Sequence, residues 1–88
     1  MALKAREWTE LDRETMRLLG EMRDTSDPRP SLRTIAERIG VTHPRVKALF
    51  DMTGGTPTLD EVCDLCDLFG VRPDALLAQA ARNTGRYD

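Results

Sequence analysis

The sequence predicts an all-α fold of five helices, and three features lead to this expectation. Apolar residues recur at spacings of three and four, the period of an amphipathic helix, and no stretch alternates as a half-buried strand would. Ser or Thr stands before four of the periodic stretches, where a helix N-cap is expected. Gly and Pro separate the stretches. The 88 residues, 40% hydrophobic and 32% charged, suit one small globular domain spanning residues 1–88.

The first predicted helix begins after Thr9 and ends near Asp24. One face carries its apolar stripe, which consists of Leu11, Thr15, Leu18, Leu19 and Met22. Thr9 and Asp12 have the spacing of a capping box. Trp8, directly before the cap, is expected to pack against the domain.

A second, short helix is predicted after a loop. Pro28 and Pro30 exclude helix from that loop, because proline disfavours helical geometry in the residue before it. Ser31 caps the helix, which covers about residues 32–39. Gly40 ends it, since glycine adopts the left-handed conformation at a helix exit most easily.

A third helix follows within three residues. Thr42 is its N-cap and Pro44 lies in its first turn, where the missing N–H costs nothing. The helix is expected to reach about Met52 and to stop before Gly54 and Gly55.

The fourth helix opens with a capping box formed by Thr58 and Glu61 and ends at Gly70. One side carries the residues expected to be apolar and inward, namely Leu59, Val62, Cys63, Cys66 and Phe69. The other side carries Asp60, Asp64 and Asp67.

A fifth helix is predicted from Pro73 to Ala81, anchored by Leu76 and Leu77. The core helices then cover about residues 9–81, and residues 83–88 are expected to form a flexible tail.

The second and third helices have the pattern of a helix-turn-helix over about residues 32–51. Two short helices that cross closely need a small residue at the crossing and a glycine in the turn, and Ala36 and Gly40 supply them. Apolar residues must flank the turn and face the core; they are Ile35, Ile39, Val41, Val46 and Leu49.

With these positions matched, the stretch from Ser31 to Leu77 resembles the lambda repressor/Cro type of helix-turn-helix domain, the xenobiotic-response-element family. Further matches follow the motif: Gly54, Pro57, the segment 59–62, the segment 69–71 and the segment 74–77. The resemblance implies a compact lambda-repressor-like domain that binds double-stranded DNA in the major groove. It also implies a transcriptional repressor of the phage Cro or immunity type.

The third helix supplies most of the expected base contacts. On a helical wheel Pro44, Lys47, Ala48 and Asp51 lie opposite the core side, with His43 and Arg45 on the flanks. Lys47 is expected to donate to guanine, and Pro44 and Ala48 to contact a thymine methyl. Asp51 either accepts from cytosine N4 or repels the DNA backbone.

Other residues are expected to hold phosphates. Arg33 resembles the family's backbone-contacting position, although it stands where the family often has Gln. Thr42 and the amides of Gly54, Gly55 and Thr56, just ahead of the fourth helix, form an expected anion cradle.

The charge distribution agrees with this orientation. The net charge is −2, but residues 29–49 carry a local +4 and residues 51–69 a local −5. The acidic side of the fourth helix is therefore expected to face away from DNA, because phosphates repel it.

The two cysteines favour no metal or redox site. Cys63 and Cys66 are two thiols where zinc needs four ligands, and the single histidine, His43, cannot complete the set. Both are interpreted as small buried hydrophobic residues, and no cofactor is expected. One histidine, no phosphate-binding glycine loop and no paired carboxylates also argue against an enzyme.

Other functions and the assembly stay open at this stage. The chain fits an antitoxin that represses its own operon, or an adaptor that binds proteins and not DNA. A homodimer on DNA is expected, paired through Leu77, Ala78, Ala80 and Ala81, weak or monomeric when free. No apolar stretch suggests a membrane segment or a secretory leader, so a cytoplasmic protein is expected.

Overall fold

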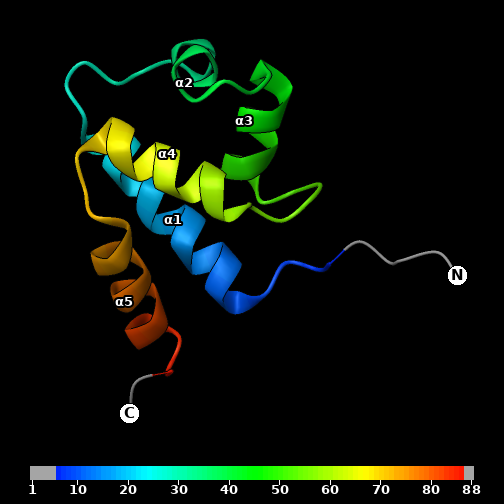
Figure 1. Cartoon of the computed structure of the whole chain (residues 1–88), viewed down its shortest axis with the longest axis vertical. Coiled ribbons are helices and arrows are strands. Elements are labelled where there is room, and N and C mark those ends of the chain that lie inside the picture. Colours follow the sequence, from blue (N-terminus) through cyan, green and yellow to red (C-terminus); the bar gives the residue numbers. More distant parts are fainter. Residues whose placement is uncertain (1–5, 87–88) are drawn as a thin grey trace, which may run out of the picture.

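The computed structural model describes residues 6–86, and five α-helices follow one another in this part of the chain (Figure 1). They are α1 (Glu10–Thr25), α2 (Leu32–Ile39), α3 (His43–Asp51), α4 (Leu59–Phe69) and α5 (Pro73–Asn83). Residues 6–86 contain no strand. The predicted all-α class is confirmed, and no helix boundary differs from the expectation by more than two residues.

The helix starts form as the local sequence predicts. Thr9 accepts a hydrogen bond from the Asp12 amide at 3.1 Å, and the Asp12 carboxylate accepts one from the Thr9 amide at 2.9 Å. Thr58 and Glu61 repeat this reciprocal pair at 3.0 and 2.9 Å. Each pair satisfies two backbone donors that a helix N-terminus otherwise leaves without partners.

Three helices end on a residue in the left-handed conformation, which is a glycine in two of them. Gly40 ends α2 with φ of 75°, and Gly70 ends α4 with φ of 72°. The third is α3, which ends close to the expected position with Met52 as its C-cap, a non-glycine residue with φ of 60°. A left-handed conformation costs an L-residue roughly 1–2 kcal/mol, so the packing around Met52 must offset this strain.

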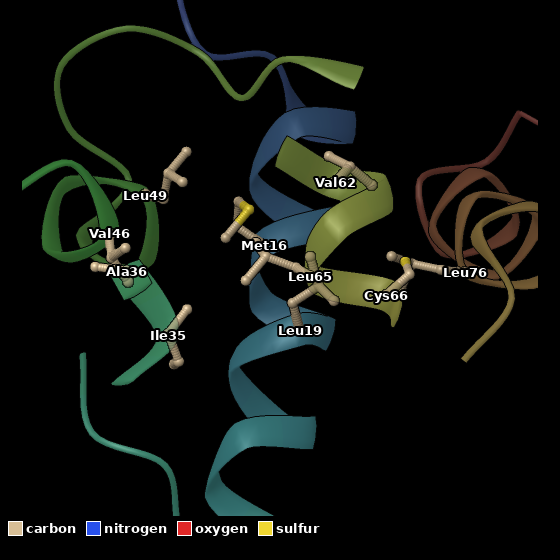
Figure 2. Close-up of a cluster of buried hydrophobic side chains, with 10 residues drawn as sticks. All are labelled: Met16, Leu19, Ile35, Ala36, Val46, Leu49, Val62, Leu65, Cys66 and Leu76. Carbon is tan, nitrogen blue, oxygen red and sulfur yellow. The ribbon is translucent and has the colours of Figure 1, made fainter. Parts of the chain in front are cut away.

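The core lies along α1, which runs through the middle of the molecule beside α4 (Figure 1). α2 and α3 pack against each other, and both contact α1 or α4, while α5 packs against α1 and α4. The buried core residues are drawn in Figure 2: Met16, Leu19, Ile35, Ala36, Val46, Leu49, Val62, Leu65, Cys66 and Leu76. Every helix contributes to this one cluster, so α2 and α3 are held by the same core as the rest of the fold.

The orientation of α4 differs from the prediction. Leu59 is 76% exposed and Cys63 is exposed, whereas both were expected on the inner side. The helix turns Leu65 to the centre of the core, with Val62 and Cys66 beside it. The buried stripe therefore follows positions 62, 65 and 66 and continues to the half-buried Phe69, which leaves positions 59 and 63 outside it.

The end of the chain also differs from the expected flexible tail. α5 continues to Asn83, whose side chain donates to the Glu14 carboxylate at 2.7 Å. The Thr84 hydroxyl donates to the Ala80 carbonyl at 2.9 Å, and the Arg86 amide bonds the Ala81 carbonyl at 2.8 Å. Residues 83–86 are therefore tied to α5 and α1, while residues 87 and 88 lie outside the described residues.

Within residues 6–86, no helix is both long enough and apolar enough to cross a membrane.

Candidate nucleic-acid interface

A three-residue turn joins α2 to α3 and holds the two helices in a fixed relation. The amides of Gly40 and Val41 both bond the Ala36 carbonyl, at 2.9 and 3.2 Å, so the turn closes on the last turn of α2. Ala36 on α2 and Val46 on α3 are buried in the core. Thr42 then starts α3 by accepting from the Arg45 amide at 3.2 Å. These bonds set the direction in which α3 leaves the turn.

α3 buries one face and exposes the other, as the helical wheel predicts. Val46 and Leu49 are fully buried, and the half-buried Phe50 lies under the Arg23 guanidinium, 5.7 Å from its ring centroid. The exposed face carries His43, Pro44, Lys47 and Asp51. Ala48 is only half-buried. This face has no helix packed over it in the described part of the chain (Figure 1).

Lys47 and Asp51 form an ion pair on the exposed face. The Lys47 ammonium lies 2.6 Å from the Asp51 carboxylate, one helical turn away. Both side chains stay open to solvent, at 61% and 51% exposure. The pair is therefore accessible, and its two charges nearly cancel at a distance.

Arg45 has a different environment from Lys47, although only two residues separate them. Its guanidinium makes two bonds of 2.7 Å to the Glu61 carboxylate on α4. It also donates to the carbonyls of Gly55 at 2.9 Å and Thr56 at 3.0 Å. Arg45 was predicted to contact DNA, and the structure instead places all its donor nitrogens on the protein itself.

The Arg45–Glu61 pair also sets the ionisation of Glu61. The Arg45 guanidinium holds the pKa of the Glu61 carboxyl below its usual value, with the Thr58 amide helping and burial opposing. Glu61 is buried, with 10% of its side chain exposed, against 23% for Arg45. A partly buried, two-bond pair of this kind fixes geometry better than an exposed one.

The loop between α3 and α4 is held by residues from the start of the chain. The Trp8 indole donates to the Gly54 carbonyl at 2.9 Å, and the Arg6 guanidinium donates to the Thr56 hydroxyl at 3.2 Å. Arg6 also pairs with Asp12 at 2.8 Å. The expected packing of Trp8 is confirmed, since the ring lies against the core as well.

The backbone amides of this loop remain available. Among residues 6–86, no hydrogen bond uses the N–H groups of Gly54, Gly55 or Thr56, whereas their carbonyls are occupied. Gly54 has φ of 70° and lies close to Ala48, whose Cβ is 3.9 Å from the position that a Gly54 Cβ would take. The loop therefore covers part of Ala48, and its free backbone N–H groups lie near the end of α3.

Arg33 and Thr42 complete the set of predicted contacts. Arg33 is exposed in the first turn of α2, and no ion pair in the described chain involves it. The Thr42 hydroxyl accepts from α3 but can still donate its own hydrogen. Arg38, by contrast, lines a hollow together with Asp64 and Asp67 of α4. The acidic side of α4 therefore lies beside the C-terminal end of α2.

The two cysteines are in unlike environments and both are free thiols. Burial raises the pKa of the Cys66 thiol to about 11, so at neutral pH it is not a thiolate and not a ready metal ligand. Cys63 points outward instead. No group of three or more potential metal ligands occurs among the residues that the structure describes.

Arg6 and Glu61 organise this surface, and neither role was predicted from the sequence. Arg6 has no local signal, because its partner Thr56 lies 50 residues away. Glu61 had a signal, since it is the acid of a capping box, but only the fold brings Arg45 to it.

Comparison with known proteins gave no match: no family model, no curated protein and no solved structure is similar to this chain.

Proposed function

We propose that this chain is a sequence-specific double-stranded DNA-binding protein that acts as a transcriptional repressor in the cytoplasm. In this proposal α2 and α3 form a helix-turn-helix, and α3 enters the major groove. The observation that carries it is the pairing of a buried α2–α3 contact with an uncovered α3 face that presents His43, Pro44 and Lys47. The two free thiols agree with a reducing compartment.

The N-terminal half of α3 supplies the base contacts. The N-terminal residues of such a helix reach base edges, so His43 and Pro44 enter first and Lys47 follows one turn later. Lys47 donates to the acceptors of guanine, and Pro44 contacts a thymine methyl.

Phosphates bind on both sides of α3. Arg33 at the start of α2 and the Thr42 hydroxyl supply donors on one side. The amides of Gly54, Gly55 and Thr56 supply them on the other, because none of these N–H groups bonds to another group among residues 6–86. Backbone amides directed at an anion suit phosphate, and such contacts fix the register of a protein on the duplex.

Arg45 serves this surface as a positioning residue. Its bonds to Glu61 and to two loop carbonyls hold the loop amides against the end of α3. We therefore assign it no direct DNA contact, in place of the contact that its position in the sequence suggests.

A protein-binding adaptor is the rival function, and Asp51 is the observation that favours it. A carboxylate on the exposed face of α3 opposes approach to phosphates. The two functions differ in their dependence on salt, since phosphate contacts release counterions.

Salt-dependent binding of the full chain to duplex DNA tests the proposal. Fluorescence anisotropy on a site selected from a randomised duplex library should give a logarithm of the binding constant that falls steeply with the logarithm of salt concentration, by about 0.9 for each phosphate contact. Arg33→Ala should lower this slope by about one. Arg72→Ala is the matched control, because it removes an equal charge at the start of α5, which does not contact α3. Absence of binding at low salt, or binding indifferent to salt, would contradict the proposal and favour the adaptor.

A further inference from the structure

The Lys47–Asp51 pair places a donor and an acceptor side by side on the exposed face of α3. The two groups lie 2.6 Å apart, and more than half of each side chain is open to solvent. A side chain on a helix leans toward the N-terminus, so the Asp51 carboxylate lies over the turn that carries Lys47. Although Asp51 is the last residue of α3, its charge is therefore held back toward the middle of the helix.

We propose that Lys47 and Asp51 act as one unit that selects a G·C base pair, with Lys47 donating to guanine and Asp51 accepting from cytosine N4. This inference rests on the proposed function, since it requires α3 in the major groove.

The spacing of the ion pair matches the edge of a G·C pair. In that base pair the cytosine N4 amine bonds the guanine O6, so these atoms lie about 2.9 Å apart. The amine keeps a second hydrogen that points into the major groove, and O6 and N7 present free lone pairs there. A donor and an acceptor 2.6 Å apart can therefore meet O6 and N4 without separating from each other.

The order of groups along the edge distinguishes G·C from A·T. G·C presents two acceptors and then a donor, so the ammonium faces N7 and O6 while the carboxylate faces only N4. A·T presents an acceptor, a donor and another acceptor. A carboxylate placed on the adenine amine would lie between two acceptors, which repel it. The direction of α3 then determines which strand carries the guanine.

The same pair explains how a carboxylate is compatible with a DNA-binding face. An isolated Asp51 would repel phosphates on every sequence, whereas a paired Asp51 is neutralised by Lys47. On G·C the pair stays intact and gains two bonds, whereas on A·T a carboxylate that reaches the adenine amine also meets the thymine O4, which repels it. Asp51 therefore lowers the affinity for incorrect sequences more than it raises the affinity for the correct one.

Binding of the full chain to duplex sites with single changes tests this proposal. The site is selected from a randomised library with the wild-type chain, and it should contain an invariant G·C pair in each half. Replacing that pair with A·T should weaken wild-type binding by roughly 5- to 100-fold. In Asp51→Ala the penalty should shrink several-fold, while affinity for unrelated duplexes rises because a negative charge is lost. The matched control Asp64→Ala removes the same charge from the acidic side of α4 and should leave the penalty unchanged.

A modified cytosine tests the proposed contact at the N4 atom itself. N4-methylcytosine still pairs with guanine, but its methyl group replaces the N4 hydrogen that would be donated to Asp51. It should weaken the wild-type chain and leave Asp51→Ala unaffected. The inference is overturned if Asp51→Ala strengthens binding to all duplexes equally with its G·C preference intact, or if N4-methylation has no effect on the wild type. If the wild-type chain binds no duplex at all, the proposed function itself fails, and this inference fails with it.

Discussion

Arg45 and Lys47 lie two residues apart in α3, but Arg45 bonds to other parts of the fold whereas Lys47 pairs within its own helix. Arg45 gives its guanidinium to Glu61 and to two loop carbonyls, while Lys47, within residues 6–86, pairs with its own helix neighbour Asp51 alone. Both have the same formal charge and both count toward a basic stretch in the sequence. Their different partners make one a structural link and the other an available donor.

The Arg45–Glu61 pair should stabilise the fold in a pH-dependent way. Arg45→Ala should lower the free energy of unfolding by about 2–3 kcal/mol, between the values for exposed and for buried ion pairs, because it leaves the Glu61 carboxylate buried without its main partner. Urea unfolding at neutral pH measures this. Arg33→Ala is the control, since it removes an equal charge from an exposed position and should have little effect.

Acid should remove the stabilisation that this pair gives, because the pKa of Glu61 is lowered in the folded chain. Its stabilisation is complete above the unfolded value of about 4.3 and is lost as the pH falls through the lower folded pKa. Glu61→Gln should therefore be less stable than the wild type at pH 7 and should lose less stability between pH 6 and pH 3. Equal losses in both proteins would contradict the assigned cause. Glu14, whose pKa the Arg17 and Asn83 side chains lower to about 2, contributes acid sensitivity to both.

At the scale of the element, α4 is rotated relative to the orientation expected from its apolar residues. Leu65 takes the centre of the core and Cys63 turns outward, although Cys63 and Cys66 were expected on the same inner side. Residues three apart on a helix differ by about 60° in direction, so a modest rotation buries one of them and exposes the other.

The two cysteines provide a matched pair that tests this rotation. Cys66→Ser should lower the free energy of unfolding by about 1–3 kcal/mol, because it places a hydroxyl in an apolar core. Cys63→Ser should change it by less than about 0.5 kcal/mol, as exposed substitutions usually do. Thermal or urea unfolding compares them.

Thiol labelling gives a second, independent measurement. The native chain should react rapidly with a maleimide at Cys63 alone, since Cys66 is buried and its pKa is raised to about 11. Two rapid reactions in the folded protein would rule out the observed orientation of α4.

The overall dimensions of the molecule and the apolar surface of α5 determine how two copies could bind DNA together. The described residues measure 39 × 37 × 18 Å, a flat body about one DNA turn wide. The apolar strip expected to pair two copies is smaller than predicted, because Ala80 and Ala81 are buried within the fold. Leu77 and Ala78 remain half-buried. Free chains are therefore expected to associate weakly.

We expect two copies to bind an inverted repeat, with half-sites about 10–10.5 base pairs apart between centres. One short α3 spans too few base pairs for tight binding, so a second copy on the next turn of the duplex must add contacts. Sedimentation should find a monomer when free and two chains on a full site. Inserting about five base pairs between the half-sites should abolish joint binding, and about ten should restore much of it, since half a turn moves one site to the opposite face. A single chain with full affinity on an isolated half-site would exclude pairing.

The helices of this protein, and the residues that begin and end most of them, can be predicted from local sequence. Capping bonds join residues three apart, as in Thr9 with Asp12 and Thr58 with Glu61, so they are encoded locally. The exposed face of α3 follows from the same local periodicity, because helical geometry alone sets which residues oppose Val46 and Leu49.

Which charged side chains of the candidate site are available depends on contacts between distant parts of the chain. Arg45 meets Glu61 across 16 residues, Trp8 meets Gly54 across 46, and Arg6 meets Thr56 across 50. The outward turn of Cys63 likewise depends on how the helices pack. Such contacts form only after distant segments are brought together, and neither composition nor spacing along the chain encodes which partners will meet.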